Sequence, residues 1–287
     1  MKVAVFQFSP TPGVMEPNLA TILNGVDRAA QAGADLFVAP EMSLTGWTLR
    51  DAWVRAELAI AVHETALPAL ERAANLWRIG IVVGGPGALD SSTSGRGAAP
   101  ILANTVFGLG PDGSRTLYHK IHLFEQERHW WEAGDATAVA EFGGVRVGLT
   151  ICYDAEFPEV PRMTRLAGAD LLVVPTTNMT PYAPDQDLIF ATRALENEFP
   201  VVVANRVGSE NGWTYFGRSL ITDRRGRIIA QAGSAEQLLI ADVELSQPGD
   251  PALSYLGRRR PEVYGPLVKV HTHLPGPVSR LPESEIG

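Results

Sequence analysis

Apolar residues recur along the chain in two patterns: short continuous runs, which predict buried strands, and positions three or four residues apart, which predict helices. The run Val145–Ile151 is rich in β-branched residues and follows Gly143-Gly144, which is typical of a buried strand. In Asn18–Ala32 the apolar residues recur at helical spacing, and Gly33 follows as a cap. The order strand, helix, strand is predicted twice. The segments are Lys2–Phe8, Asn18–Ala32 and Ala34–Ala39 in the first unit, and Val145–Ile151, Pro158–Leu166 and Leu171–Val174 in the second.

The two units also resemble each other in sequence. Residues 31–40 read Gln-Ala-Gly-Ala-Asp-Leu-Phe-Val-Ala-Pro, and residues 166–175 read Leu-Ala-Gly-Ala-Asp-Leu-Leu-Val-Val-Pro. The similarity can reflect an internal duplication or the same strand–helix–strand arrangement formed independently in two places, and both explanations remain open. In either case, the second strand of each unit is expected to lie parallel to the first, with a right-handed crossover.

The rest of the chain adds further elements without a composition shift that would mark an internal boundary. Ala88–Ala99 is rich in Gly and Ser and is expected to be an unstructured loop, and from Ser246 the chain is Pro-rich, which indicates an arm lying over the domain or a partner. We therefore predict one α/β domain of stacked sheets with outer helices. The additional predicted helices are Ala52–Asn75 and Gln186–Asn197, and the additional predicted strands are Ile79–Gly84, Ile101–Gly110, Arg115–His119, Pro200–Arg206, Tyr215–Asp223, Arg227–Gln231 and Leu238–Glu244.

Composition excludes several classes of protein. With 45% hydrophobic and 20% charged residues, the 287-residue chain can bury a sizeable core. The net charge of −8 argues against a nucleic-acid partner, and no apolar run approaches the ~20 residues of a membrane span. The N-terminus enters a strand pattern directly, and the single cysteine excludes an intramolecular disulfide. These features predict a soluble, cytoplasmic protein without a membrane partner.

Three predicted strands end at residues with reactive side chains: Glu41, Lys120 and Cys152. Taken alone, each has a simpler explanation, since a single cysteine often packs as a small hydrophobe and a Glu or Lys in a loop is often solvated. Ligands of open α/β folds bind beyond the carboxyl ends of strands, so the shared placement favours a common site. There a thiol can attack a carbonyl or nitrile carbon while a carboxylate transfers the proton, and a Lys120 cation favours the thiolate and stabilises an oxyanion.

Three motifs in this order resemble the nitrilase superfamily of carbon–nitrogen hydrolases. They are Pro40-Glu-Met-Ser-Leu-Thr-Gly46, His119-Lys-Ile-His-Leu-Phe124 and Leu149-Thr-Ile-Cys-Tyr-Asp-Ala-Glu-Phe-Pro-Glu159. The resemblance implies a four-layer α-β-β-α sandwich over residues 1–265, a C-terminal arm over 266–287, and a homodimer or higher homo-oligomer. It also implies a Glu41, Lys120 and Cys152 triad that uses no metal or cofactor. A second family glutamate falls on Glu127, where it would position Lys120 or the substrate nitrogen, although a solvated loop carboxylate remains open.

The branch of the superfamily is inferred from the residues after Cys152. Members that cleave nitriles commonly carry Trp-Glu there, whereas this chain carries Tyr153-Asp154 and looks more like aliphatic and stereoselective amidases. Omega-amidase relatives usually carry Arg where Ala155-Glu156 stands. We therefore expect a small-molecule amide substrate, which is cleaved to carboxylate and ammonia through a Cys152 thioester. The expected substrate contacts are Tyr153, Thr176, Thr177, Asn178 and Trp131, with Trp47, Trp130 and Tyr182 as further candidate aromatics of the pocket.

Other functions remain open at this point. N-carbamoyl amines or amino acids need the same triad, and nitrile hydrolysis is disfavoured only by Tyr153-Asp154. A metal-dependent hydrolase would use His119 and His122, with Glu125 or His129 nearby, but strand-to-loop spacing does not place the two His on one face. A catalytically silent binding protein would be expected to have lost at least one member of the triad.

Overall fold

The computed structural model describes residues 1–89, 101–245 and 254–269. Contacts divide the chain into two compact units, Met1–Pro248 and Gly249–Gly287. The described part of the second unit contains two short 3-10 turns, Pro261–Val263 and Gly265–Val268. Most of the loop expected at 88–99 and most of the arm expected at 266–287 lie outside the described residues. The domain boundary at residue 265 stays a prediction.

Two six-stranded sheets form the first unit. In sheet order, the first sheet contains β14 (Gln237–Asp242), β1 (Lys2–Gln7), β2 (Leu36–Val38), β3 (Gly80–Ala88), β4 (Leu102–Leu109) and β5 (Arg115–His119). The second contains β13 (Ile228–Gln231), β12 (Leu220–Thr222), β9 (Val201–Ala204), β8 (Leu171–Pro175), β7 (Val145–Leu149) and β6 (Ala138–Phe142). As predicted, β1 pairs with β2 and β7 with β8 in parallel.

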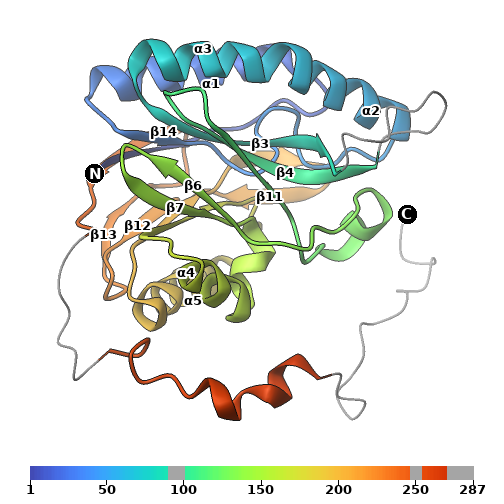
Figure 1. Cartoon of the computed structure of the whole chain (residues 1–287). Coiled ribbons are helices and arrows are strands. Elements are labelled where there is room, and N and C mark those ends of the chain that lie inside the picture. The colour runs from blue at the N-terminus through green and yellow to red at the C-terminus, as the bar shows by residue number, and fades with distance from the viewer. Residues whose placement is uncertain (90–100, 246–253, 270–287) are drawn as a thin grey trace. The chain divides into compact units, whose positions relative to one another are not determined.

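The helices cover the outer faces of the two sheets (Figure 1). They are α1 (Glu16–Gln31), α2 (Ala52–Ala61) and α3 (Leu67–Trp77) on the first sheet, and α4 (Glu159–Leu166) and α5 (Ala183–Asn197) on the second. A π-helical turn, Val62–Ala66, joins α2 to α3 just before Pro68, whose ring has no N–H for a regular helical bond. The predicted helix Ala52–Asn75 is therefore continuous except for this turn.

Alternation along the strands explains the four layers. Val3 and Val5 of β1 belong to the buried cluster between the sheets, together with Val147 of β7, because side chains two residues apart share a face. Phe6, on the opposite face of β1, belongs to the cluster under α1. On the far side, Val174 of β8 packs in a third cluster that includes residues of α5. This arrangement confirms the predicted α-β-β-α sandwich.

Part of the predicted strand pattern was wrong. The expected strand Tyr215–Asp223 is broken at Gly217 and Arg218, whose φ angles of 71° and 56° are incompatible with a strand. Its two parts are β11 (Trp213–Phe216), which forms a separate hairpin with β10 (Val207–Glu210), and β12 of the second sheet. Strand β6 was not predicted. No helix among the described residues is long and apolar enough to cross a membrane.

Candidate active site

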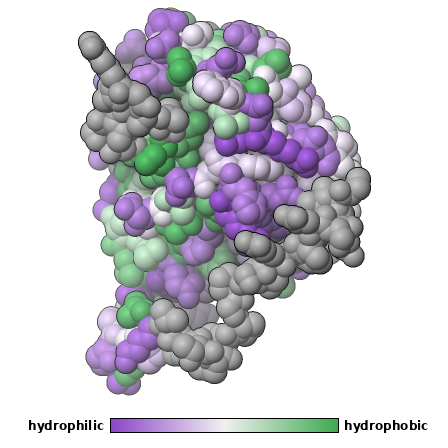
Figure 2. Space-filling view, turned by 90° about the vertical axis from the view of Figure 1, so that its right-hand side faces the viewer, coloured by the Kyte–Doolittle hydropathy of each residue, from purple (hydrophilic) through white to green (hydrophobic). Residues whose placement is uncertain are grey.

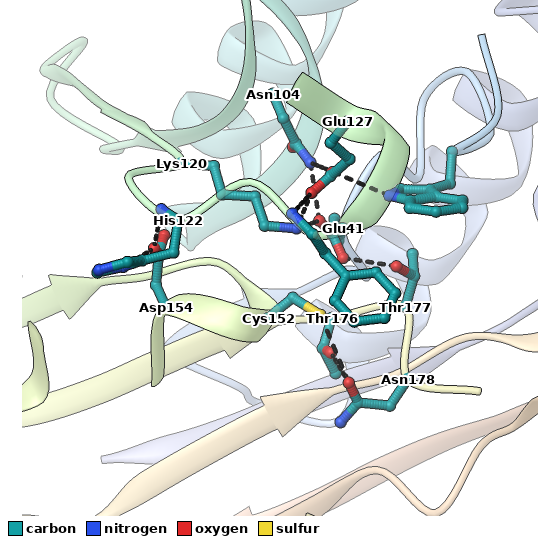
Figure 3. A network of polar contacts seen from close by, with 12 residues as sticks. Glu41, Asn104, Lys120, His122, Glu127, Cys152, Asp154, Thr176, Thr177 and Asn178 are labelled. Carbon is teal, nitrogen blue, oxygen red and sulfur yellow. Dashed lines mark hydrogen bonds and ion pairs between the residues drawn. The ribbon is translucent and has the colours of Figure 1, made fainter. Parts of the chain in front are cut away.

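Cys152 opens a 3-10 turn, Cys152–Glu156, that follows β7. Its φ of 46° lies in the left-handed region, which costs a non-glycine residue about 1–3 kcal/mol. The side chain is buried, and the Sγ–H donates to Asn178 Oδ1 at 3.4 Å. Thr176 donates to the same oxygen at 2.9 Å. The segment after β8 therefore fixes the direction of the thiol (Figure 3).

Glu41 follows the end of β2 and is fully buried. Its Oε1 accepts from Lys120 Nζ at 2.8 Å and from Asn104 Nδ2 at 2.7 Å, and its Oε2 accepts from Thr177 Oγ1 at 2.6 Å. The turn that carries Glu41 lies against β3 at Gly84, where a Cβ would stand 2.5 Å from the backbone N of Met42. Only glycine leaves room for this close approach.

Lys120 and Glu127 complete a buried network above Cys152 (Figure 3). Lys120 follows β5, and its Nζ lies 2.7 Å from Glu127 Oε2 as well as 2.8 Å from Glu41 Oε1. Glu127 Oε1 accepts from Asn104 Nδ2 and from Trp47 Nε1, both at 2.9 Å. Glu127 is fully buried, so it is not the solvated loop carboxylate that the sequence left open. Asn104 was not predicted, although its one amide nitrogen bridges both carboxylates.

The charges of the network set the protonation of its members. Burial raises the pKa of the Cys152 thiol well above its usual range, the Glu41 charge adds to the rise, and the Lys120 charge opposes it. Burial alone would lower the pKa of Lys120, but the charges of Glu127, Glu41 and Cys152 outweigh burial and hold that pKa well above its ordinary value. The resting site therefore pairs a neutral thiol with an ammonium group. As predicted, the Lys120 charge lowers the pKa of the Cys152 thiol, but burial and the Glu41 charge raise that pKa by more.

A second carboxylate network joins the turn after Cys152 to the segment after β5. Asp154 is fully buried and accepts from the Tyr118 hydroxyl at 2.8 Å and from the backbone N–H groups of Ile121 and His122 at 3.2 and 2.6 Å. His122 Nδ1 lies 2.9 Å from the same carboxylate, whereas His119 Nδ1 lies 2.8 Å from Thr105 Oγ1. The two His thus have separate partners. Within residues 1–89, 101–245 and 254–269, no three His, Cys, Asp or Glu side chains are grouped to hold a metal ion.

A cavity of about 290 Å³ opens onto Cys152 and Lys120. Of the expected substrate contacts, Tyr153, Thr177 and Asn178 line it, and so do the candidate aromatics Trp47 and Tyr182. The other lining residues are Phe124, Glu156, Met179, Asp185, Gln186, Ile189 and Phe190.

Two of the expected contacts lie elsewhere. Thr176 is fully buried, bonds to Asn178 and is not part of the cavity wall. Trp131 packs in the cluster under α1–α3 and, with Trp130, lines a different cavity beside Arg55. The sequence could not separate these two adjacent tryptophans from Trp47, because an aromatic residue suits a core and a pocket equally well.

Comparisons with known proteins agree with this geometry. The family model for carbon-nitrogen hydrolases matches residues 2–250. An (R)-stereoselective amidase from Pseudomonas sp is 32% identical over 248 residues, covering 86% of each chain, and a nitrilase from Pyrococcus abyssi is 32% identical over 253 residues, covering 85% of this chain and 90% of that one.

Among solved structures, a variant of the amidase from Nesterenkonia sp. AN1 superposes with a TM-score of 0.79 at 26% identity, over 92% of this chain and 95% of that one. That structure shows covalent addition of the acetamide moiety of fluoroacetamide at its active-site cysteine. The family match extends across both sheets and all three strand ends that bear Glu41, Lys120 and Cys152, so this chain belongs to the carbon-nitrogen hydrolase family.

Proposed function

We propose that the protein hydrolyses small linear amides to carboxylate and ammonia through a thioester on Cys152. The observation that carries this proposal is the burial of Glu41 and Lys120 in one network beside the cavity that exposes Cys152. The relatives named as amidases support the choice of an amide over other carbon–nitrogen bonds. Tyr153-Asp154 after Cys152 supports the same choice over nitrile hydrolysis.

In the first half of the reaction, Cys152 Sγ attacks the amide carbon while its proton passes to Glu41. A free thiol and a free carboxyl differ by about 4 pKa units, or ~6 kcal/mol, so full proton transfer before attack is costly. The raised pKa of Cys152 increases that cost, which favours proton loss as the S–C bond forms. Lys120 Nζ and the Tyr153 backbone N–H, at the start of the 3-10 turn, stabilise the oxyanion. Glu41 then protonates the departing nitrogen, and ammonia leaves.

In the second half, Glu41 removes a proton from a water molecule that attacks the thioester. Collapse of the second tetrahedral intermediate breaks the C–S bond and returns the proton to Cys152 Sγ, so that the net reaction is R-CO-NH2 + H2O → R-COOH + NH3. Glu127 holds Lys120 Nζ in addition to Glu41 and thereby acts as a positioning residue.

Ammonia release from a panel of amides, N-carbamoyl compounds and nitriles tests this proposal. We expect release from amides by the wild-type protein and none by Cys152→Ala. Because the chain has one cysteine, a short-lived acyl adduct in the intact-protein mass can be assigned to Cys152 by its absence from the same variant. If carbamoyl compounds or nitriles were preferred, that class would replace amides as the proposed substrate. Full activity of Cys152→Ala would refute the thioester mechanism.

We also infer that the protein is a homodimer or a larger homo-oligomer. Apolar side chains exposed on α4 and α5 support this: Met163 is 46%, Leu166 54% and Leu188 70% exposed. Such residues are common at subunit contacts when they gather in patches. On the face drawn in Figure 2, hydrophobic residues likewise gather in patches between hydrophilic ones. Light scattering on the purified full chain should give at least twice the mass of 30.9 kDa, and a monomer at micromolar concentration would contradict the inference.

A further inference from the structure

Glu156 places a carboxylate in the cavity wall without a partner. It is the last residue of the turn that begins at Cys152, and it lines the same cavity. Within the described part of the chain, no hydrogen bond or ion pair reaches its carboxylate. Burial raises the pKa of this carboxyl and the Asp185 charge adds to the rise, and together they outweigh the charges of Lys120 and Arg193, which lower it. Neither half of the proposed hydrolysis uses this carboxylate.

The cations nearest to Glu156 are already bound to other groups. Lys120 Nζ lies between the carboxylates of Glu41 and Glu127. The Arg193 guanidinium donates to the backbone oxygens of Ala155 and Glu156 and to the Glu196 carboxylate. Both charges act on the Glu156 carboxylate from a distance, but neither side chain forms a hydrogen bond or an ion pair with it among the described residues.

The remainder of the cavity wall suits a cation. A second carboxylate, Asp185, lines the cavity at the start of α5. Five aromatic rings line it as well, and ring faces attract ammonium groups. They belong to Trp47, Phe124, Tyr153, Tyr182 and Phe190. Lys120 also lines the cavity, but its single charge faces both Glu41 and Glu127, so the two further acids leave the wall negative and favour a positively charged guest over a neutral or a negative one.

We propose that the Glu156 carboxylate selects amides whose acyl part carries an ammonium group. This inference rests on the proposed amidase function and adds the class of substrate. Amides with an acyl carboxylate are disfavoured by the same charge. Glu156 would act by binding the far end of the substrate, while the reacting carbonyl stays at Cys152.

The experiment compares ω-amino amides, from glycinamide to 6-aminohexanamide, with amides in which a methyl group replaces the ammonium group. At the best chain length, we expect kcat/KM of the wild-type protein to favour the cation by about 10- to 100-fold, the usual effect of a hydrogen bond to a charged group. Glu156→Gln should bring this ratio close to one. The matched control is Glu159→Gln, the same change on an exposed side chain outside the cavity wall, which should keep the ratio. Glu156→Arg should turn the preference toward the monoamides of dicarboxylic acids.

A second measurement needs no turnover. Butylammonium ions should slow the alkylation of Cys152 by iodoacetamide in the wild-type protein, and Glu156→Gln should abolish this protection, whereas 1-butanol should protect both proteins equally. Equal kcat/KM for charged and uncharged amides would overturn the inference and leave the amidase function intact. Absence of ammonia release from every amide would refute the proposed function, and the protection assay would then decide on cation binding alone.

Discussion

Replacing Asn104 by Leu tests whether one buried amide holds the two glutamates in place. The variant has a similar volume but loses both charge-assisted hydrogen bonds, at 2.7 Å to Glu41 and 2.9 Å to Glu127. Hydrogen bonds to charged groups contribute about 1.5–3 kcal/mol each, which gives an upper limit of about 3–6 kcal/mol. The Asn104 side-chain oxygen is buried without a partner, and its removal returns about 1–3 kcal/mol. We therefore expect a net loss of about 2–3 kcal/mol in unfolding free energy.

Thermal unfolding and steady-state kinetics measure the two consequences separately. For a domain of this size, the loss corresponds to a fall in Tm of roughly 4–12 °C. On an amide substrate, kcat should fall by more than about tenfold, since misplacement of the acid–base group affects the chemical step. Asn75→Leu is the control, because Asn75 donates a single bond to the Pro111 backbone oxygen at the protein surface. Activity of Asn104→Leu within twofold of wild type would refute the idea that Asn104 positions the carboxylates.

Three further predictions follow from the site. Thr177→Val removes the 2.6 Å bond to Glu41, worth about 1.5–3 kcal/mol, so kcat on an amide should drop about tenfold or more while KM changes less. Because burial raises the pKa of Cys152, its alkylation rate should keep rising with pH through about 10, whereas a thiol of ordinary pKa, ~8.5, levels off above about pH 9, and such a plateau would contradict the expectation. Gly84→Ala should lower the free energy of unfolding by about 1–3 kcal/mol and also lower activity, because the new methyl group would stand 2.5 Å from the backbone. Gly233→Ala is the control: its methyl group meets open space and should change neither stability nor activity. Equal losses in the two variants would show that the turn after β2 has room to shift.

The reactive ends of the strands could be predicted because each follows a clear apolar run. Glu41, Lys120 and Cys152 stand at the point where a strand pattern stops, and the motifs around them identified the family. Asn104 could not be found in this way, because it lies inside the apolar run of β4 and its role depends on a carboxylate 63 positions away in sequence. The hairpin β10–β11 had an available signal, the Asn211-Gly212 pair, which favours a tight turn.

The substrate contacts were harder to predict because the chain alone gives no direction for a side chain after a strand end. Thr176 and Thr177 are adjacent, yet Thr177 faces Glu41 and the cavity, whereas Thr176 bonds to Asn178 and does not line the cavity. In the sequence, Glu156 stands out only as part of the motif that follows Cys152. Its placement in the wall follows from the 3-10 turn that starts at Cys152 and brings the two residues to the same cavity.

The catalytic residues come from both sheets, so the active site forms only when the two sheets pack together. Glu41 and Lys120 follow strands of the first sheet, whereas Cys152 and Asn178 follow strands of the second. A fragment that contains only one sheet would hold either the acid and the cation or the thiol, but never the set. Complementation of the chain cut between β5 and β6 would therefore restore turnover only as fast as the two halves dock, both through the apolar interface between the sheets and through β14 of the second half, which pairs with β1 of the first. The single thiol of Cys152 thus reports on docking of the sheets. Burial should keep its alkylation slow, so faster alkylation would be an early sign that the sheets have separated.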